Sequence, residues 1–571
     1  MPVSGERSGG LHPLSPAAAA SNTPRRWLFG LVLATVAFKV WLSAVFPVTG
    51  DEAYFIYWGV SPALGYYDHP PMVGWLLALL LKISDAPWVL RLPVTLLPAF
   101  IALVLYGVLR RLPELDQREP GGREAAEQNS AEQKAAWTAI GFLLLPAQVW
   151  NIFITTDTPL VFWSFLSGLA FWRAVRLRSD VGIASDGWFA MAGALLGLAF
   201  LSKYFAALLA LAYVVYVLVS PRGQRPWRGL AITLLVVLPF AGLNLYWNWQ
   251  DCWANIMFNL YNRNDDAGLS WRTPLLYGVS LLYMLPPLAL FILARHRGWM
   301  ARLAGDASLR LMAVLGGVPY IAFAVLSLGK QIGLHWMLSF VPFFCAAAAL
   351  ALPRRALVHS AVFLAVFSAI HVAGIAAGAS LPLQAWKSSR LYDGIVFNVR
   401  IDELLAQLKP YEGEYAIAAD GYSAAVIASY YRMRDAEHEG GAAQAGAVRD
   451  AMQHGDSPYV FVFGEASSHA RQDDLVMDFR RLQGRNILVL RKSPPQEADY
   501  KPYFATVEYR SFDVAGATFH LVLGRGFNYE SYRAAVLDKV RERYYALPRW
   551  LPQAHCVFCE RYADAGYCPV R

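Results

Sequence analysis

The sequence predicts a polytopic α-helical membrane protein that ends in a small soluble α/β domain. Of its 571 residues, 56% are hydrophobic and only 16% are charged, whereas an average soluble domain carries about 25% charged residues. The mean hydropathy is +0.34. Apolar runs long enough to cross a bilayer recur up to about residue 380, and short β-like runs follow them.

The formal net charge of +8 does not indicate a nucleic-acid-binding protein. Arg and Lys gather in short segments between the apolar runs, which is typical of cytoplasmic loops in membrane proteins. The sequence also lacks the glycine-rich motifs G-x-x-x-x-G-K-[ST] and G-x-G-x-x-G after a strand. These patterns argue against a nucleic-acid partner and against direct use of ATP or a nucleotide sugar.

Residues 25–380 form the predicted transmembrane domain, after a predicted disordered cytoplasmic tail at 1–24. Arg25 and Arg26 precede an apolar run that keeps large side chains to its end, so we expect a retained helix rather than a signal peptide. The spacing of the arginine clusters favours eleven spans with a cytoplasmic N-terminus. The expected spans are 27–47, 88–109, 136–154, 159–175, 187–202, 204–220, 229–247, 274–294, 311–329, 336–353 and 356–380.

Two connecting segments and the C-terminal region complete the predicted organisation. Residues 48–87 are a first external loop whose stretch "PPMVGWLLALLLKIS" suits interfacial helices. Residues 112–135 are charged and interrupted by Gly and Pro, which predicts a solvated cytoplasmic linker. An odd number of spans places residues 381–571 outside the cytoplasm. There "YAIAAD", "YVFVFG", "NILVLR" and "TFHLVLG" predict strands, and "GYSAAVIASYYRMR" predicts a helix.

The unusual polar residues all fall on the external side of this topology. Ionisable groups at membrane depth are costly and usually face a polar cavity, so we expect them to line one external cavity. A carboxylate there can take a proton from a hydroxyl, while cations stabilise a departing phosphate and apolar walls hold a lipid tail. A lipid-phosphate sugar donor meets these requirements. The residues are Asp51, Glu52, Asp68, His69, Asp157, Lys203, Arg263, Lys330 and His335.

Four stretches carry a resemblance to a known family. They are "GDEAYFIYWGVSPALGYYDHPPMVGWLLALL", "TTDTPLVFWSFLSGLAFWRAV", "LGLAFLSKYFAALL" and "GKQIGLHWMLSFVPFF". In order, they resemble bacterial glycosyltransferases of the GT-C superfamily, in the protein O-mannosyltransferase-like branch that includes the lipid A aminoarabinose transferases. The resemblance covers residues 27 to about 355. It implies an inverting, polyprenyl-phosphate-sugar-dependent transferase in the bacterial inner membrane, with a periplasmic site and a periplasmic C-terminal domain.

The resemblance also implies roles for individual acids and cations. Asp51 matches the family's general base, with Glu52 in support, and Asp157 matches a second family acid. Lys203 matches a lysine expected to contact the donor phosphate. We assign Arg263 and Lys330 to the same phosphate-binding group, and His335 to the substrate site.

The stretch "YYDHPP" sits where the aminoarabinose transferases carry an aromatic-acid-lysine-proline motif. This makes Asp68 a site acid and His69 a phosphate contact. A divalent metal is associated with this acid in the family, which suggests Asp68, His69 and His335 as ligands. Where those transferases often have an arginine three residues after the first acid, this chain has Tyr54. That departure leaves the sugar and the acceptor, whether lipid, glycan or protein, open.

Each of these residues also has a purely structural interpretation. Asp51, Glu52 and Asp157 suit helix N-termini, and Asp68 suits an Asx turn. The lysines and His335 could anchor helix ends at the interface, and Arg263 lies in a run typical of solvated loops.

The five cysteines predict a stapled C-terminal end. Cys252 and Cys345 stand alone in the sequence, whereas "HCVFCERYADAGYC" brings Cys556, Cys559 and Cys568 together. Outside the cytoplasm a disulfide among these three, leaving one thiol unpaired, is favoured over a zinc site with His555.

The main alternative is a transporter or flippase of a lipid-linked sugar. A transporter should show internal repeats with broken helices and ionisable residues near mid-span. In this sequence the polar residues gather at one face, which favours the enzyme. A hydrolase or ligase acting on lipid-linked glycans would use a similar cavity.

Overall fold

The computed structural model describes residues 23–115, 130–177, 182–264, 268–295, 298–438, 445–469, 471–564 and 566–570. Nearly all of the predicted tail at 1–24 lies outside the described residues. The same is true of most of the predicted linker at 112–135, whose ends are a short 3-10 turn, η1 (Pro113–Leu115), and the start of α8 (Ser130–Leu143).

Each of the eleven predicted spans coincides with a helix or with two consecutive helices. The remaining helices of the bundle are α2 (Thr23–Val45), α5 (Pro87–Leu90), α6 (Leu92–Leu109), α9 (Pro146–Trp150), α10 (Asp157–Leu177), α11 (Gly182–Phe200), α12 (Ala206–Val219), α13 (Trp227–Gln250), α15 (Arg272–Met284), α16 (Pro287–Arg295), α17 (Gly298–Arg302), α18 (Ala307–Ser327), α19 (Val341–Ala351) and α20 (Arg354–Ser380).

Fewer than eleven of these helices are long enough to cross a bilayer alone. In the described part of the chain seven helices have the length and hydropathy of a membrane span, or eight if α15 and α16 are one span bent by 104°. That bend falls at Pro286 and Pro287, as expected where proline cannot continue a helix. Ala184–Phe200 and Ala206–Val219 are shorter apolar helices. The protein is therefore a multi-pass helical membrane protein.

The segment predicted to be the first external loop contains two short helices, α3 (Gly50–Val60) and α4 (Met72–Leu81). Thr49 and Glu52 form a capping box that starts α3, because each side chain bonds to the backbone of the other. The turn between the helices is fixed by Tyr66, whose ring stacks on Trp58 at 4.2 Å and whose hydroxyl donates to the Trp58 carbonyl.

The C-terminal domain is built on one mixed sheet of strand order β2-β1-β3-β5-β4. The strands are β1 (Tyr415–Ala419), β2 (Phe461–Val462), β3 (Asn486–Arg491), β4 (Phe504–Val514) and β5 (Ala517–Phe527). β1 pairs in parallel with β2 and β3, while β5 pairs antiparallel with β3 and β4. In this register Val489 of β3 lies opposite Val522 of β5. The four predicted strands are present. The edge strand β4 was not predicted, since exposed polar residues interrupt its apolar ones and it has no apolar run.

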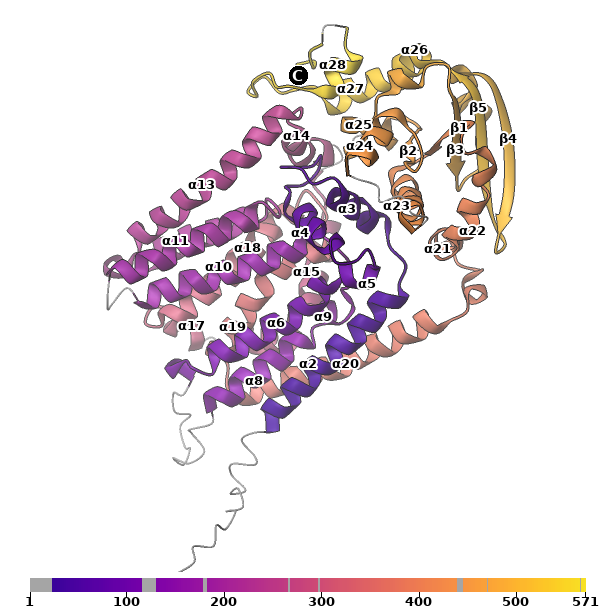
Figure 1. Ribbon diagram of the computed structural model, residues 1–571. Helices are drawn as coiled ribbons and strands as arrows, with labels where there is room; N and C mark the ends of the chain where they lie inside the picture. The colour runs from indigo at the N-terminus through magenta and orange to yellow at the C-terminus, as the bar shows by residue number, and fades with distance from the viewer. Residues whose placement is uncertain are drawn as a thin grey trace, which may run out of the picture.

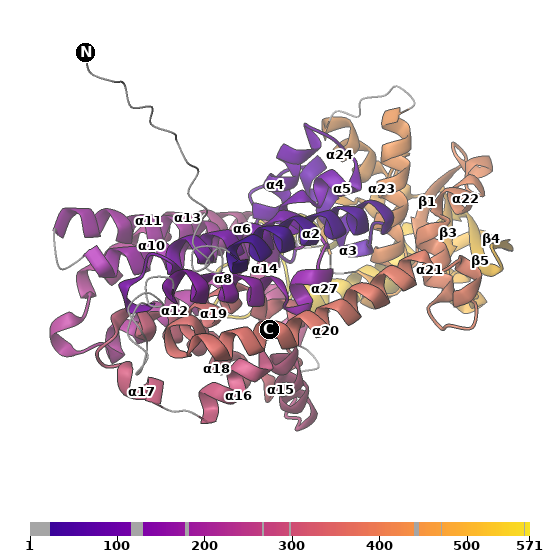
Figure 2. The same cartoon turned by 90° about the horizontal axis from the view of Figure 1, so that it is seen from below.

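Helices pack around this sheet and against the bundle. The main one, α23 (Tyr422–His438), corresponds to the predicted helical stretch, and it contacts α3. The others are α14 (Ala254–Leu260), which follows α13, and α21 (Tyr392–Val399), α22 (Ile401–Ala406), α24 (Ala445–His454), α25 (Gln472–Val476), α26 (Tyr529–Tyr532), α27 (Asp538–Tyr544) and α28 (Val557–Tyr562). The sheet lies at one end of the bundle, and α20 leads to it (Figures 1 and 2). We call this the domain end of the bundle.

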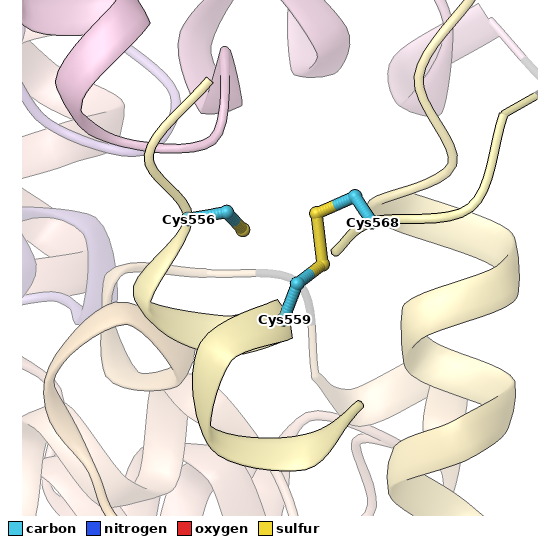
Figure 3. Close-up of side chains that lie close together, drawn as sticks. All are labelled: Cys556, Cys559 and Cys568. Carbon is cyan, nitrogen blue, oxygen red and sulfur yellow. A yellow bond between two sulfur atoms is a disulfide. The ribbon is translucent and has the colours of Figure 1, made fainter. Parts of the chain in front are cut away.

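Four of the five cysteines form two disulfides. Cys559 pairs with Cys568, as expected for a staple within the C-terminal end (Figure 3). Cys252 pairs with Cys556, so the predictions that Cys252 stands alone and that one C-terminal thiol is unpaired were wrong. The sulfurs of Cys556, Cys559 and Cys568 do lie close together, but their commitment to disulfides excludes the zinc alternative. Cys345 is a buried free thiol.

Candidate active site

An ion pair at the domain end joins two helices of the bundle. Asp157 begins α10, and Lys203 lies in the turn between α11 and α12. The Lys203 ammonium donates to both carboxylate oxygens of Asp157, at 2.9 and 2.8 Å. Nε2 of His335, in the 3-10 segment η4 (Leu334–Phe340), lies 3.8 Å from the same carboxylate. Three residues predicted to share a cavity are thus brought together.

Asp51 lies at the first turn of α3 and is exposed. One carboxylate oxygen accepts a hydrogen bond of 2.7 Å from the hydroxyl of Tyr422, the first residue of α23. The charge of Asp51 also acts on the imidazole of His335, together with those of Asp157 and Lys203. Asp51 therefore belongs to the same electrostatic cluster as the Asp157–Lys203 pair, and it is accessible to an incoming hydroxyl.

Glu52 is oriented differently from its neighbour. Its carboxylate is fully buried and forms two hydrogen bonds with Arg91, at 2.8 and 2.7 Å. It also accepts from the backbone of Ile154 and from both the backbone and the hydroxyl of Thr49. Arg91 in turn donates to three backbone carbonyls at the end of α2. Glu52 thus holds α3 against the bundle, and we expect it to position the site without contacting a substrate.

Asp68 lies in the buried turn between α3 and α4. One of its oxygens accepts from the Tyr54 hydroxyl at 3.3 Å, and the other from Arg471 at 2.7 Å. Burial raises the pKa of the Asp68 carboxyl above its usual value, and the charge of Arg471 opposes that rise. Tyr54, at the position where related transferases often carry arginine, also accepts from the backbone of Gln472.

His69 follows Asp68 in the same turn, and the backbone N–H of Met72 ties this turn to the carbonyl of Leu201, beside Lys203. Burial lowers the pKa of His69 well below its usual value, and the charges of Lys203, Arg263, Arg471 and His335 lower it further. The ring is therefore neutral near pH 7. It can donate a hydrogen bond to a phosphate but brings no charge.

Arg263 and Lys330 lie beside this cluster. The Arg263 guanidinium stacks over Trp336 at 4.9 Å, and it lies close enough to Asp68 and Asp157 for their charges to act on it. Lys330 donates to the carbonyl of Arg263 at 2.6 Å. Lys330 therefore fixes the segment that carries Arg263.

The residues suggested as metal ligands do not fit an ion together. Among the residues that the structure describes, Asp68, His69 and His335 do not bring three ligand atoms within reach of one ion. Both oxygens of Asp68 already accept hydrogen bonds, one of them from a cation. We therefore derive no step through a metal at these residues.

Two site residues come from the C-terminal domain and were not predicted. Arg471 precedes α25, and Tyr422 begins α23. Tyr422 lies in "GYSAAVIASYYRMR", which was predicted only to form a helix, and no local pattern distinguishes Arg471 from the other arginines of the domain. Their partners, Asp51 and Asp68, lie hundreds of residues away in the sequence.

Comparisons with known proteins agree with this architecture. Residues 126–247 match the family model of dolichyl-phosphate-mannose-protein mannosyltransferases. The lipid A galacturonosyltransferase RgtD of Rhizobium johnstonii is 29% identical over 205 residues, which is 35% of this chain and 38% of that relative.

Two crystal structures of ArnT from Cupriavidus metallidurans have the same fold. The structure bound to undecaprenyl phosphate matches 87% of this chain and 98% of ArnT, with a TM-score of 0.53 and 15% identity. The apo structure gives the same coverage, with a TM-score of 0.52 and 16% identity.

The fold defines a class: polytopic helical membrane proteins with a C-terminal sheet domain, of the fold seen in ArnT. Together the comparisons confirm the resemblance to GT-C superfamily glycosyltransferases of the mannosyltransferase-like and lipid A-modifying branch.

Proposed function

We propose that the protein is an inverting glycosyltransferase that moves a sugar from a polyprenyl-phosphate donor to an acceptor hydroxyl. The observation that carries this proposal is the cluster of an accessible acid, Asp51, and the Asp157–Lys203 pair at one end of a GT-C bundle. ArnT was crystallised with undecaprenyl phosphate, and RgtD is described as a lipid A galacturonosyltransferase. These names support an undecaprenyl-phosphate donor and a glycolipid acceptor.

In the proposed reaction Asp51 takes the proton of the acceptor hydroxyl as its oxygen attacks the anomeric carbon. The bond between that carbon and the phosphate oxygen breaks, and undecaprenyl phosphate leaves with the electron pair. Lys203 and Arg263 stabilise the negative charge of the leaving phosphate, and the neutral His69 donates a hydrogen bond to it. Asp157 and His335 orient Lys203.

We further propose that the protein lies in a bacterial inner membrane with its N-terminus in the cytoplasm and its active site on the periplasmic side. The arginine clusters between spans support this orientation. The two disulfides support an oxidising compartment for the C-terminal domain.

The proposal is tested with the full chain purified in detergent, incubated with undecaprenyl phosphate carrying radiolabelled sugars and with lipid A as acceptor. We expect free undecaprenyl phosphate and labelled lipid A from the wild type, and about 10²–10⁴-fold slower formation of both from Asp51→Asn. The matched control is Asp85→Asn, which removes an acid of the same external loop outside the site and should keep activity.

Two results would contradict the proposal. One is transfer that persists at the wild-type rate in Asp51→Asn. The other is movement of the intact lipid-linked sugar across a vesicle membrane without release of undecaprenyl phosphate, which would indicate the transporter.

A further inference from the structure

The C-terminal domain inserts one cation between the helices of the site. Nη1 of Arg471 lies 2.7 Å from Oδ2 of Asp68, and this acid has only 5% of its side chain exposed. The guanidinium also stacks over the ring of Tyr422 at 4.5 Å and over Phe258 of α14 at 5.5 Å. Arg471 is thus held by groups of both the bundle and its own domain.

Tyr422 connects this cation to the proposed base. Its hydroxyl donates to Asp51, and its ring packs at 6.0 Å from Tyr54, the residue that donates to Asp68. The two acids of the first external loop are therefore linked through one arginine and one tyrosine of the C-terminal domain.

The segment that carries Arg471 is fixed in the core of its domain. His469 is buried, with one ring nitrogen 2.7 Å from Asp474 and the other 2.9 Å from the hydroxyl of Tyr532. Asp473 accepts from the hydroxyl of Tyr459 and from the backbone of Val462. These hydrogen bonds on both sides of Arg471 fix the backbone position from which its side chain reaches Asp68.

The helices α23 and α3 pack closely against each other. A Cβ added to Gly50, next to Asp51, would lie 2.2 Å from the hydroxyl oxygen of Ser423. Glycine at this position lets α23 approach closely enough for the hydroxyl of Tyr422 to reach Asp51.

Asp68 needs such a cation. A buried carboxylate without a partner becomes protonated, and Arg471 is the cation that contacts it. His69, the next residue of the same turn, is neutral near pH 7 and cannot supply this charge. The C-terminal domain thus supplies, from a distant part of the sequence, a positive charge that the local motif lacks.

We infer that Arg471 and Tyr422 are positioning residues of the active site, so that the C-terminal domain completes the catalytic centre. This inference rests on the proposed transferase function. Tyr422 orients the Asp51 carboxylate toward the acceptor hydroxyl, and Arg471 pairs with the buried Asp68 and holds the ring of Tyr422 in place.

The test measures kcat, donor KM and melting temperature for Tyr422→Phe, Arg471→Gln and Arg471→Lys in the full chain, with radiolabelled undecaprenyl-phosphate sugar. A hydrogen bond to a charged group is worth about tenfold in rate or more. We expect Tyr422→Phe to lower kcat about tenfold, with donor KM and melting temperature unchanged. Arg471→Gln should lower kcat at least as much, and Arg471→Lys should recover part of the loss.

The matched controls are Tyr411→Phe and Arg510→Gln. Arg510 donates to the hydroxyl of Tyr411 at 2.9 Å on an exposed edge of the same domain, so these variants should keep wild-type kcat. Unchanged kcat in both Tyr422→Phe and Arg471→Gln would overturn the inference, and if Arg471→Gln does not fold, unchanged kcat in Tyr422→Phe would overturn it. A wild type without turnover would instead refute the proposed transferase, and the inference with it.

Discussion

Asp51 and Glu52 are neighbours with the same functional group, yet they lie in opposite environments. Successive residues of a helix point about 100° apart, so α3 directs Glu52 into the bundle and Asp51 toward the C-terminal domain. Glu52 is buried and saturated by Arg91, Thr49 and Ile154. Asp51 is exposed and accepts from one tyrosine. The sequence alone therefore does not tell which of two adjacent acids is a buried structural partner and which is free to react. That distinction requires knowing which side of the helix is covered.

The largest expected effect falls on the Asp51 side. Asp51→Asn keeps the shape of the side chain and the hydrogen bond from Tyr422 but removes the base, and general base catalysis contributes about 10²–10⁴-fold. We expect kcat to fall by about that factor with an unchanged melting temperature. A melting temperature that falls with activity would place Asp51 in the same class as Glu52.

The reverse result is expected for Glu52→Gln. Removing one partner of a buried ion pair leaves an uncompensated charge, which costs about 3–5 kcal/mol. The melting temperature in detergent should drop sharply, and the double variant with Arg91→Met should recover part of it because no charge is left buried. Asp51→Asn is the matched control. A stable Glu52→Gln protein that lacks activity would contradict the structural role.

An intermediate effect is expected from the disulfide that joins the end of α13 to the C-terminal domain. Cys252→Ser opens a link between residues 304 apart in sequence, whereas Cys559→Ser opens one that spans nine. Disulfides stabilise by about 2–4 kcal/mol, and more for longer loops, so Cys252→Ser should lower the melting temperature more. Cys345→Ala, which alters the buried free thiol, serves as the control for cysteine replacement. Equal losses for the two disulfides would argue that Cys252 does not hold the C-terminal domain.

The smallest effect concerns pH. The pKa of His69 is lower in the folded protein than the usual value near 6.5. Below pH 6.5, therefore, His69 binds a proton in the unfolded chain but not in the folded one. Stability is then lost as the pH falls, by at most about 1.4 kcal/mol per pH unit for one proton. Melting curves from pH 7.5 to 5.5 should decline more steeply for the wild type than for His69→Asn. Parallel curves would mean that His69 takes up a proton in the folded state.

The sequence predicted the helical regions and the strands that are most buried, because long apolar runs and compact β-branched segments carry local signals. β4 was missed since an edge strand with charged residues at alternate positions, such as Glu508 and Arg510, lacks an apolar run. Cys252 was taken as isolated because nothing in its neighbourhood points to Cys556.

In the candidate site, too, some features could be predicted from the sequence and others could not. Topology alone put Asp51, Asp157 and Lys203 on one side of the membrane, and the structure joins the last two directly. Their catalytic roles remain predictions. Arg471 could not be predicted, because its importance arises from a contact with Asp68 across 403 residues of sequence, and single-sequence patterns extend over only a few turns.

The bond between Cys252 and Cys556 constrains the order of biogenesis. The two thiols can meet only on the same side of the bilayer, and therefore only after the membrane helices between them, α15 to α20, have been inserted. An oxidase that closes this bond therefore acts on a chain whose topology is already decided, and a wrongly inserted copy would keep two reactive thiols. Alkylation of these thiols in nascent protein would report how far insertion has proceeded.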